Sequence, residues 1–279
     1  MFRKITIRVS TMEEILTYYD EKAKNYDATY GILCFKVLDA ITWKYLEPYL
    51  TTNANAFVLD AGGGTGRWAI QMARKGCNVV LADASEEMLK IAAEKIRKEK
   101  LQHKINVEKS DITKTPHPSK SFDMIFCEQT FFLFKNPDTL IREMARVLKK
   151  GARLVISAQN RYVQCLASLS ENPNSENLDK TLNLLHCKEY STMTKSGSVK
   201  IYTRTPDEFR TILERNGFHI EKIVGKGITM PLRISKETSM RQDYPDDLLE
   251  KILEFEFALC EKPDALSLAG HLQAIARKL

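Results

Sequence analysis

The residues best suited to chemistry lie in one glycine-rich segment, VLDAGGGTGRW (58–68). A carboxylate, Asp60, comes just before the glycines, which include Gly62 and Gly64. Glycine lacks a side chain and adopts unusual backbone angles, so a ligand can pack against the main chain of such a loop. A second carboxylate, Asp83, ends the next apolar run and is suited to binding a ribose diol through both oxygens. The pattern predicts a ligand that contains a nucleoside.

Two classes of cofactor compete for this loop. Dinucleotide sites use G-x-G-x-x-G, because the pyrophosphate binds at the N-terminus of the following helix. Counting from Gly62, the third glycine position holds Arg67. A carboxylate at Asp60 would repel a pyrophosphate, whereas it favours a cationic ligand. S-adenosylmethionine has an ammonium and a sulfonium group and no phosphate, so the charges favour it over the cofactor of an NAD(P)-dependent oxidoreductase.

Strand and helix signals alternate between about residues 55 and 158, and these elements have to position the two acids. Apolar runs of strand length alternate with segments whose apolar residues recur three and four positions apart. The expected strands are 56–61, 77–83, 104–111, 121–128 and 152–159. We expect helices after the first, second and fourth strands, with Ser85 capping the second helix and Gly151 just past the end of the third. The expected apolar faces are Trp68, Ala69, Met72 and Ala73 in the first helix and Met88, Leu89, Ala92, Ala93 and Ile96 in the second. The alternation predicts a doubly wound, mostly parallel α/β sheet.

The regular alternation ends after Asn160, where polar stretches such as SENPNSENLDK interrupt short helical patches. Later signals include a capping box at Thr205, a strand at 217–225 and a closing strand at 271–278. A helix near 246–261 is expected to bury Leu248, Ile252, Phe255 and Leu259. The predicted units are an N-terminal helix with the cofactor-binding half (1–160), a cap insertion (161–198), and the rest of the sheet (199–279) with a second insertion at about 227–268.

Composition narrows the class of protein. The 279 residues carry a net charge of +6, from 42 basic and 36 acidic residues, and the basic residues form no dense block. Six scattered cysteines contain no CxxC pair and indicate thiols in a reducing compartment. The N-terminal MFRKITIRVS lacks the apolar stretch of a secretory signal, and no apolar run approaches the length of a membrane span. We therefore expect a cytoplasmic protein with no metal site.

These motifs resemble those of the class I, Rossmann-like methyltransferases that use S-adenosylmethionine. The sequence is most similar to the small-molecule enzymes of the type 11 or type 25 kind. The resemblance covers roughly residues 15–160 and extends more loosely to 199–225 and the last strand. It implies a seven-stranded, mostly parallel sheet, with helical cap insertions in the two regions outside the resemblance.

The resemblance also assigns residues to the cofactor. VLDAGGGTGRW looks like the family's first motif, and VVLADASEEML (79–89) like the second, in which Asp83 would hold the ribose hydroxyls. SDITKTP (110–116) looks like the third motif, and YYDEKAKNYDATYG (18–31) like an N-terminal helix whose tyrosines close over the cofactor. The residues expected at the cofactor are Tyr19, Tyr26, Asp60, Gly62, Gly64, Asp83, Ala84, Met88, Asp111, Ile112 and Glu128.

Each of these roles has a purely structural alternative. Asp83 and Asp111 are also suited to capping a helix or a turn, and Glu128 could be a solvated strand end. Tyr19 and Tyr26 lie seven positions apart, so they would share one helix face, which simple packing would also produce. The alternatives remain open at this point.

The implied reaction is in-line transfer of a methyl group to a small-molecule acceptor, chosen by the two insertions. Aligning a nucleophile leaves little trace in sequence, and we assign no catalytic residue. The segment CEQTFF (127–132) lacks the Asn-Pro-Pro-aromatic and Pro-Cys loops of nucleic-acid methyltransferases, which together with the mild charge disfavours a nucleic-acid partner. RNA- or protein-directed methyl transfer and non-catalytic cofactor binding are the alternatives.

Overall fold

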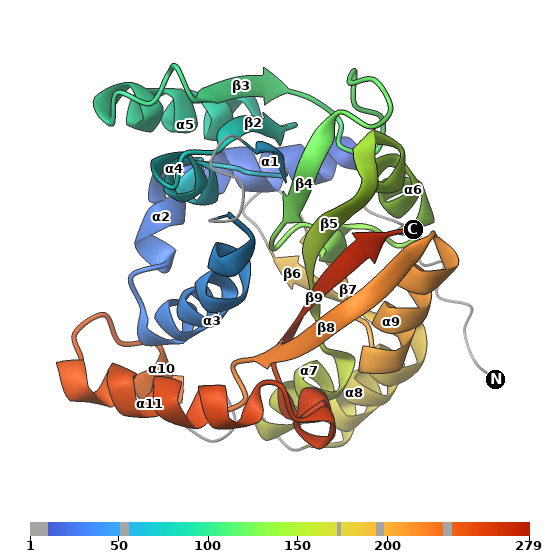
Figure 1. Ribbon diagram of the computed structural model, residues 1–279. Coiled ribbons are helices and arrows are strands. Elements are labelled where there is room, and N and C mark those ends of the chain that lie inside the picture. The colour runs from blue at the N-terminus through green and yellow to red at the C-terminus, as the bar shows by residue number, and fades with distance from the viewer. Residues whose placement is uncertain (1–10, 51–55, 172–173, 194–197, 231–235) are drawn as a thin grey trace.

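A seven-stranded sheet forms the centre of the computed structural model, which describes residues 11–50, 56–171, 174–193, 198–230 and 236–279 (Figure 1). Its strand order is β3-β2-β1-β4-β5-β9-β8. The first five pair in parallel, and β9 runs antiparallel to both β5 and β8. The strands are β1 (Phe57–Ala61), β2 (Asn78–Asp83), β3 (Ile105–Lys109), β4 (Phe122–Cys127), β5 (Leu148–Gln159), β8 (Phe218–Lys226) and β9 (His271–Lys278). The doubly wound, mostly parallel sheet expected from the sequence is confirmed.

Helices cover both faces of this sheet, because its strands are apolar on both sides. One buried cluster packs β1, β2 and β4 against α3 (Leu33–Leu50), α4 (Arg67–Arg74), α5 (Glu86–Lys98) and α11 (Asp246–Leu259). The cluster on the other face includes α6 (Asp138–Val147) and α9 (Pro206–Arg215). The crossovers after β1, β2 and β4 therefore produce the two outer layers.

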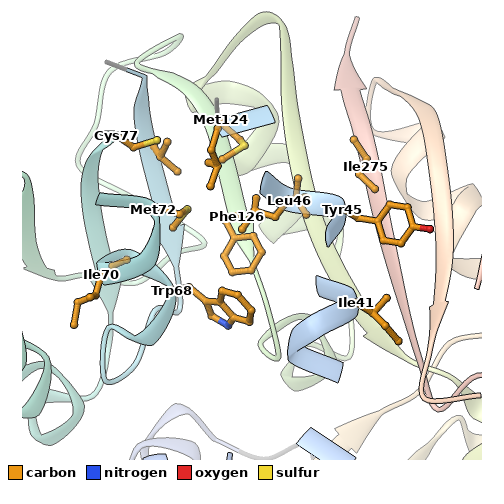
Figure 2. Close-up of a cluster of buried hydrophobic side chains, with 14 of the residues drawn as sticks. Ile41, Tyr45, Leu46, Trp68, Ile70, Met72, Cys77, Met124, Phe126 and Ile275 are labelled. Atoms are coloured by element: carbon orange, nitrogen blue, oxygen red, sulfur yellow. The ribbon is translucent and has the colours of Figure 1, made fainter. Parts of the chain in front are cut away.

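The apolar stripe of α4 fixes the start of that helix against the sheet. Figure 2 shows Trp68 and Met72 of α4 beside Phe126 of β4, in the layer that α3 closes. The rings of Trp68 and Phe126 meet edge to face at 5.5 Å. All four residues of the expected stripe, Trp68, Ala69, Met72 and Ala73, are buried. This packing holds the glycine-rich loop, which leads directly into α4.

Two helix starts are formed by the expected caps. The Ser85 hydroxyl accepts the Met88 backbone N–H at 3.1 Å and begins α5. Thr205 and Glu208 form the reciprocal capping box that begins α9. Local sequence signals were sufficient here because each cap involves residues only three positions apart.

Three local expectations were wrong. Helix α6 ends at Val147, not near Gly151, because Leu148 turns extended and pairs with Phe122 of β4. Ala93, expected on the buried face of α5, is exposed. Phe255, expected on the buried face of α11, is 55% exposed, because the face of α11 that packs on the core is rotated toward Leu249 and Leu253.

The chain before β1 and the two regions outside the central repeat supply the remaining elements. Residues 11–50 form α1 (Met12–Lys22), η1 (Ala23–Asn25), α2 (Tyr26–Thr29) and α3. After β5 come α7 (Arg161–Glu171), α8 (Ser175–Cys187), β6 (Glu189–Met193) and β7 (Ser198–Tyr202), the last two pairing as a separate hairpin. After β8 come α10 (Lys236–Ser239), α11 and η3 (Pro263–Leu268). Within the described ranges, no helix is long and apolar enough to cross a membrane.

Candidate active site

A pocket lies at the carboxyl ends of β1, β2 and β4, under α1. Its free space, counted to its open mouth, is ≈ 740 Å³. A smaller hollow adjoins it beside the glycine-rich loop and shares Tyr26, Gly62, Gly64, Glu128 and Gln129 with it. The larger pocket is lined by ten of the eleven expected residues: Tyr19, Tyr26, Gly62, Gly64, Asp83, Ala84, Met88, Asp111, Ile112 and Glu128. Asp60, the eleventh, lines the smaller hollow.

The glycines of the loop would exclude a larger side chain for different reasons. Gly62 has φ +77°, and a Cβ there would lie 2.4 Å from the Thr130 hydroxyl oxygen. A Cβ on Gly63 would lie 2.8 Å from Asp60 Oδ2. Gly64 has φ +53°, and a Cβ there would meet nothing within 4 Å. Only at Gly64 does the structure leave open space in which a ligand could pack against the loop.

Asp83 lies at the end of β2, where main-chain donors hold its carboxylate. Its Oδ2 accepts the Gly64 backbone N–H at 2.9 Å, and its Oδ1 accepts the Ser85 backbone N–H at 2.9 Å. Burial raises the pKa of this carboxyl, and the two backbone donors oppose that rise. Each carboxylate oxygen has a second lone pair, so Asp83 can still accept hydrogen bonds from a diol.

Asp60, the residue before the last of β1, is a buried and incompletely paired acid. It is 2% exposed, and its Oδ2 has no hydrogen-bond partner among the described residues. Burial, followed by the nearby Asp83, raises the pKa of Asp60 to about 7. A cation beside Asp60 would favour its ionised form. The orphaned oxygen therefore fits the ammonium or sulfonium group of S-adenosylmethionine.

The part of the pocket expected to hold the nucleoside, around Met88, Asp111 and Ile112, has both apolar and charged side chains. Ile112 and Met88 are buried there and give an apolar surface that suits a base. Asp111 is exposed, and its Oδ1 accepts the backbone N–H and the hydroxyl of Thr113 at 2.8 and 2.7 Å. The turn-capping role that the sequence left open for Asp111 is therefore present, and Asp111 also lines the pocket.

The tyrosines expected over the cofactor do line the pocket, but they do not share one helix. Tyr19 belongs to α1 and Tyr26 begins α2, with η1 between them. Their ring centroids are nevertheless 6.3 Å apart, and Tyr30 continues the row at 5.4 Å from Tyr26. Burial raises the pKa of both Tyr19 and Tyr26. The break in the helix lets the chain wrap around the pocket mouth.

Three acids attach this N-terminal segment to the cofactor-binding half. Asp20 accepts a hydrogen bond from the Ser85 hydroxyl at the start of α5. Asp27 accepts hydrogen bonds from the Thr65 hydroxyl and from Lys95, each at 2.6 Å. Asp39 pairs with both terminal nitrogens of Arg67, whose guanidinium lies 3.4 Å from the ring centroid of Tyr30. Polar contacts thus hold the N-terminal segment, α1 to α3, to the glycine-rich loop, to α4 and to α5. We call the part that carries Tyr19 and Tyr26 the lid.

Sequence reasoning missed one buried pair at the other end of the pocket. Lys226, the last residue of β8, donates hydrogen bonds to Glu128 Oε1 at 2.7 Å and to the Thr42 hydroxyl at 2.9 Å. Its side chain is 0% exposed, and that of Glu128 is 7% exposed. The strand prediction stopped at Gly225, and no short motif links Lys226 to a residue so distant in sequence.

The apolar wall of the pocket was also missed. It combines Met12, Ile15 and Leu16 of α1 with Leu133 and Phe134 from the segment after β4. Scattered apolar residues of this kind resemble ordinary core positions in sequence. The described parts of the two insertions contribute no side chain to the lining of this pocket. Across the described residues, no group of His, Cys, Asp and Glu side chains could hold a metal ion.

Comparison with known proteins agrees with this geometry. Residues 59–156 match the family model described as "Methyltransferase domain". The chain is 36% identical over 109 residues to methyltransferase GfsG of Streptomyces halstedii, a match that covers 39% of each chain. It is 25% identical over 266 residues to the tRNA 5-carboxymethoxyuridine methyltransferase of Escherichia coli (strain K12), which covers 93% of this chain and 95% of that protein.

Among solved structures, the [4+2]-cyclase SpnF is similar over 98% of both chains, with a TM-score of 0.65 and 20% identity, which shows the shared fold. The sheet order, the glycine-rich loop and the match over residues 59–156 support a class I S-adenosylmethionine-dependent methyltransferase of the type 11 group.

Proposed function

We propose that this methyltransferase acts on a small molecule with an apolar part and holds S-adenosylmethionine in the pocket under α1. The charge of the lining carries the cofactor placement. The described residues around the larger pocket include three carboxylates, Asp83, Asp111 and Glu128, and no Lys, Arg or His. Such a lining favours a cationic ligand and disfavours phosphates. When bound, the cofactor supplies a methyl group on a positively charged sulfur that leaves as a neutral thioether.

In this proposal each group of residues has a separate task. Asp83 binds the ribose hydroxyls, and Ile112 with Met88 packs against the base. Asp60 and the main chain at Gly64 receive the cationic end, while Tyr19 and Tyr26 exclude water from above. An in-line displacement depends mainly on such alignment and on a dry site.

The proposed acceptor is small and partly apolar because apolar side chains share the pocket lining with Glu128. They include Leu16 of α1 and Leu133 and Phe134 after β4. A cytoplasmic location is part of the proposal, and six unpaired cysteines support it.

A tRNA acceptor is the second candidate, because the match to the E. coli tRNA methyltransferase extends over nearly the whole chain. Radiolabelled methyl transfer into a cell extract, afterwards separated into RNA, protein and small molecules, distinguishes the two. We expect label in the small-molecule fraction. Label confined to tRNA would replace our proposal with the second candidate.

Replacing Asp83 tests the cofactor placement directly. The Asp83→Asn variant keeps the shape of the side chain but removes its charge and one acceptor oxygen. We expect S-adenosylhomocysteine to bind roughly tenfold or more weakly, as loss of a charge-assisted hydrogen-bond pair implies. Calorimetric titration measures this, with Asp123→Asn, at the opposite end of the sheet, as the control. Unchanged affinity in Asp83→Asn would remove Asp83 from the site.

A further inference from the structure

The buried Lys226 is unusual because it neutralises a carboxylate in the pocket wall. Its ammonium group donates a hydrogen bond to Glu128 Oε1, and the hydroxyl of Thr42 in α3 provides a second acceptor. A buried charge is strongly unfavourable unless it is paired and hydrogen-bonded. The ion pair therefore gives each group a partner, and it holds the Glu128 side chain against β8.

Glu128 has a second oxygen that nothing in the described chain uses. Its Oε2 is buried without a hydrogen-bond partner, although Glu128 lines both the larger pocket and the adjoining hollow. An unsatisfied buried acceptor destabilises the folded protein, and more strongly when it is charged. A donor on a ligand in the pocket would recover that free energy.

The position of Glu128 indicates which part of a ligand it would meet. Asp83, Met88 and Ile112 mark the nucleoside end of the pocket, whereas Glu128 lies at the junction with the hollow that contains Asp60. A nucleoside at the first end places the methyl-bearing end of the cofactor toward Glu128. The acceptor has to approach that same place.

We propose that Glu128 Oε2 accepts a hydrogen bond from the N–H or O–H of the acceptor's nucleophile, and that Lys226 and Thr42 are positioning residues that orient it. The proposal rests on the cofactor placement given above. It narrows the acceptor to an amine or a hydroxyl compound, because the nucleophile has to carry an N–H or O–H that the Glu128 carboxylate can accept.

The chemistry balances without any further reactant. The lone pair of the acceptor nitrogen or oxygen forms a bond to the methyl carbon, and the carbon–sulfur bond breaks with its electron pair passing to sulfur. The nucleophile gains positive charge as the methyl arrives, and the carboxylate beside it stabilises that charge. The proton of the nucleophile passes to Glu128 Oε2 and then to water.

Sinefungin tests this placement without knowledge of the acceptor. It resembles S-adenosylhomocysteine but carries an amine where the transferred methyl group would lie. In the wild type we expect sinefungin to bind at least about tenfold more tightly than S-adenosylhomocysteine, as a charge-assisted hydrogen bond implies. In Glu128→Gln the ratio of the two Kd values should fall to near one, while S-adenosylhomocysteine affinity changes less than about threefold.

The outcomes separate the alternatives. If Glu128→Gln weakens both ligands equally, Glu128 contacts the ammonium group that they share, and the proposal is wrong. If neither affinity changes, Glu128 is structural, and the proposal is again wrong. If the wild type binds neither ligand, the cofactor placement itself fails. Glu221→Gln, an exposed residue of β8, is the matched control and should keep the wild-type ratio.

A folding defect does not prevent the test. Glu128→Gln leaves Lys226 buried without a counter-charge, so the double variant Glu128→Gln, Lys226→Met is measured beside it, since it contains neither charge. The positioning role is tested by Thr42→Val, which should lower the sinefungin preference in the wild type and change nothing in the Glu128→Gln background. An equal effect of Thr42→Val in both backgrounds would overturn that role.

Discussion

Asp60 and Glu128 illustrate two ways in which this fold leaves a carboxylate unsatisfied. Glu128 has a buried cation at one oxygen, whereas Asp60 has a raised pKa of about 7. The protonated form of Asp60 needs no counter-charge, so the ligand-free pocket can take up a proton there. A cationic ligand reverses that preference. Proton release at Asp60 should therefore accompany cofactor binding.

This linkage predicts a pH dependence of binding. The pKa of Asp60 lies at about 7 when folded, above the ordinary 3.8, so its protonation stabilises the folded chain at low pH, and that contribution is lost as the pH rises toward 7. Cofactor affinity should rise about tenfold between pH 6 and pH 8, as the ionised fraction of a group with this pKa does. Calorimetry at several pH values measures it.

The Asp60→Asn variant is the control for that prediction, because it cannot titrate. Any pH dependence that remains in it belongs to the ligand or to other groups. If the wild type and Asp60→Asn follow the same pH profile, Asp60 does not take part in binding.

Some residues of the site could be predicted from the sequence, and others could not. Asp60, Gly64 and Asp83 were predictable because each follows a strong strand signal and strand ends meet at one edge of a parallel sheet. The role of Lys226 was not, because the antiparallel position of β8 and the approach of Thr42 from α3 bring it to Glu128. Such a contact depends on tertiary packing, which no local pattern records.

In the glycine-rich loop, two substitutions are expected to have different main effects, one on the stability of the fold and one on cofactor binding. Gly62→Ala forces a Cβ to within 2.4 Å of Thr130, so we expect it to lower the free energy of unfolding by ~1–3 kcal/mol. Gly64→Ala adds backbone strain at φ +53° but places its methyl group in open space, and it should weaken S-adenosylhomocysteine binding roughly tenfold or more. Denaturant unfolding and calorimetry measure the two effects.

Gly217→Ala is the matched control for Gly64→Ala. Gly217 also has positive φ, +87°, and open space around a Cβ, but it lies between α9 and β8 and does not line the pocket. The two variants share the backbone strain, and only Gly64→Ala would contact a ligand. Equal binding by both variants would show that Gly64 serves the turn alone.

The elements that sequence predicted well were those with complete local signals. The cap of α5 and the apolar stripe of α4 were confirmed because each is decided within one or two helical turns. The prediction for the lid was wrong in detail. One helix through Tyr19 and Tyr26 was expected, but η1 lies between the two helices that carry them. The three acids that attach this segment act across long separations, and helical periodicity does not report them.

For the molecule as a whole, β9 is the element on which the sheet depends most. It pairs with β5 on one side and β8 on the other, so its residues are hydrogen-bonded at both edges (Figure 1). Ile275→Pro removes a ladder donor in a central strand, where proline is not tolerated. We expect no cooperative unfolding transition from this variant by circular dichroism.

A milder substitution at the same site is the control. Ile275→Val keeps the strand and removes one methylene from the cluster in Figure 2, which should cost ~0.5–1.5 kcal/mol. A cooperative transition in Ile275→Pro close to that of Ile275→Val would mean that β9 is dispensable.

The position of β9 also imposes an order on biosynthesis. On a ribosome, β8 is made before β9, yet among the described strands β9 is its only neighbour in the sheet. A nascent chain can therefore assemble the glycine-rich loop and the β1–β4 half early, whereas β8 cannot pair until β9 has been made. Because Lys226 belongs to β8, the counter-charge of Glu128 arrives among the last parts. An incomplete chain would thus display the nucleoside end of the pocket before its reacting end exists.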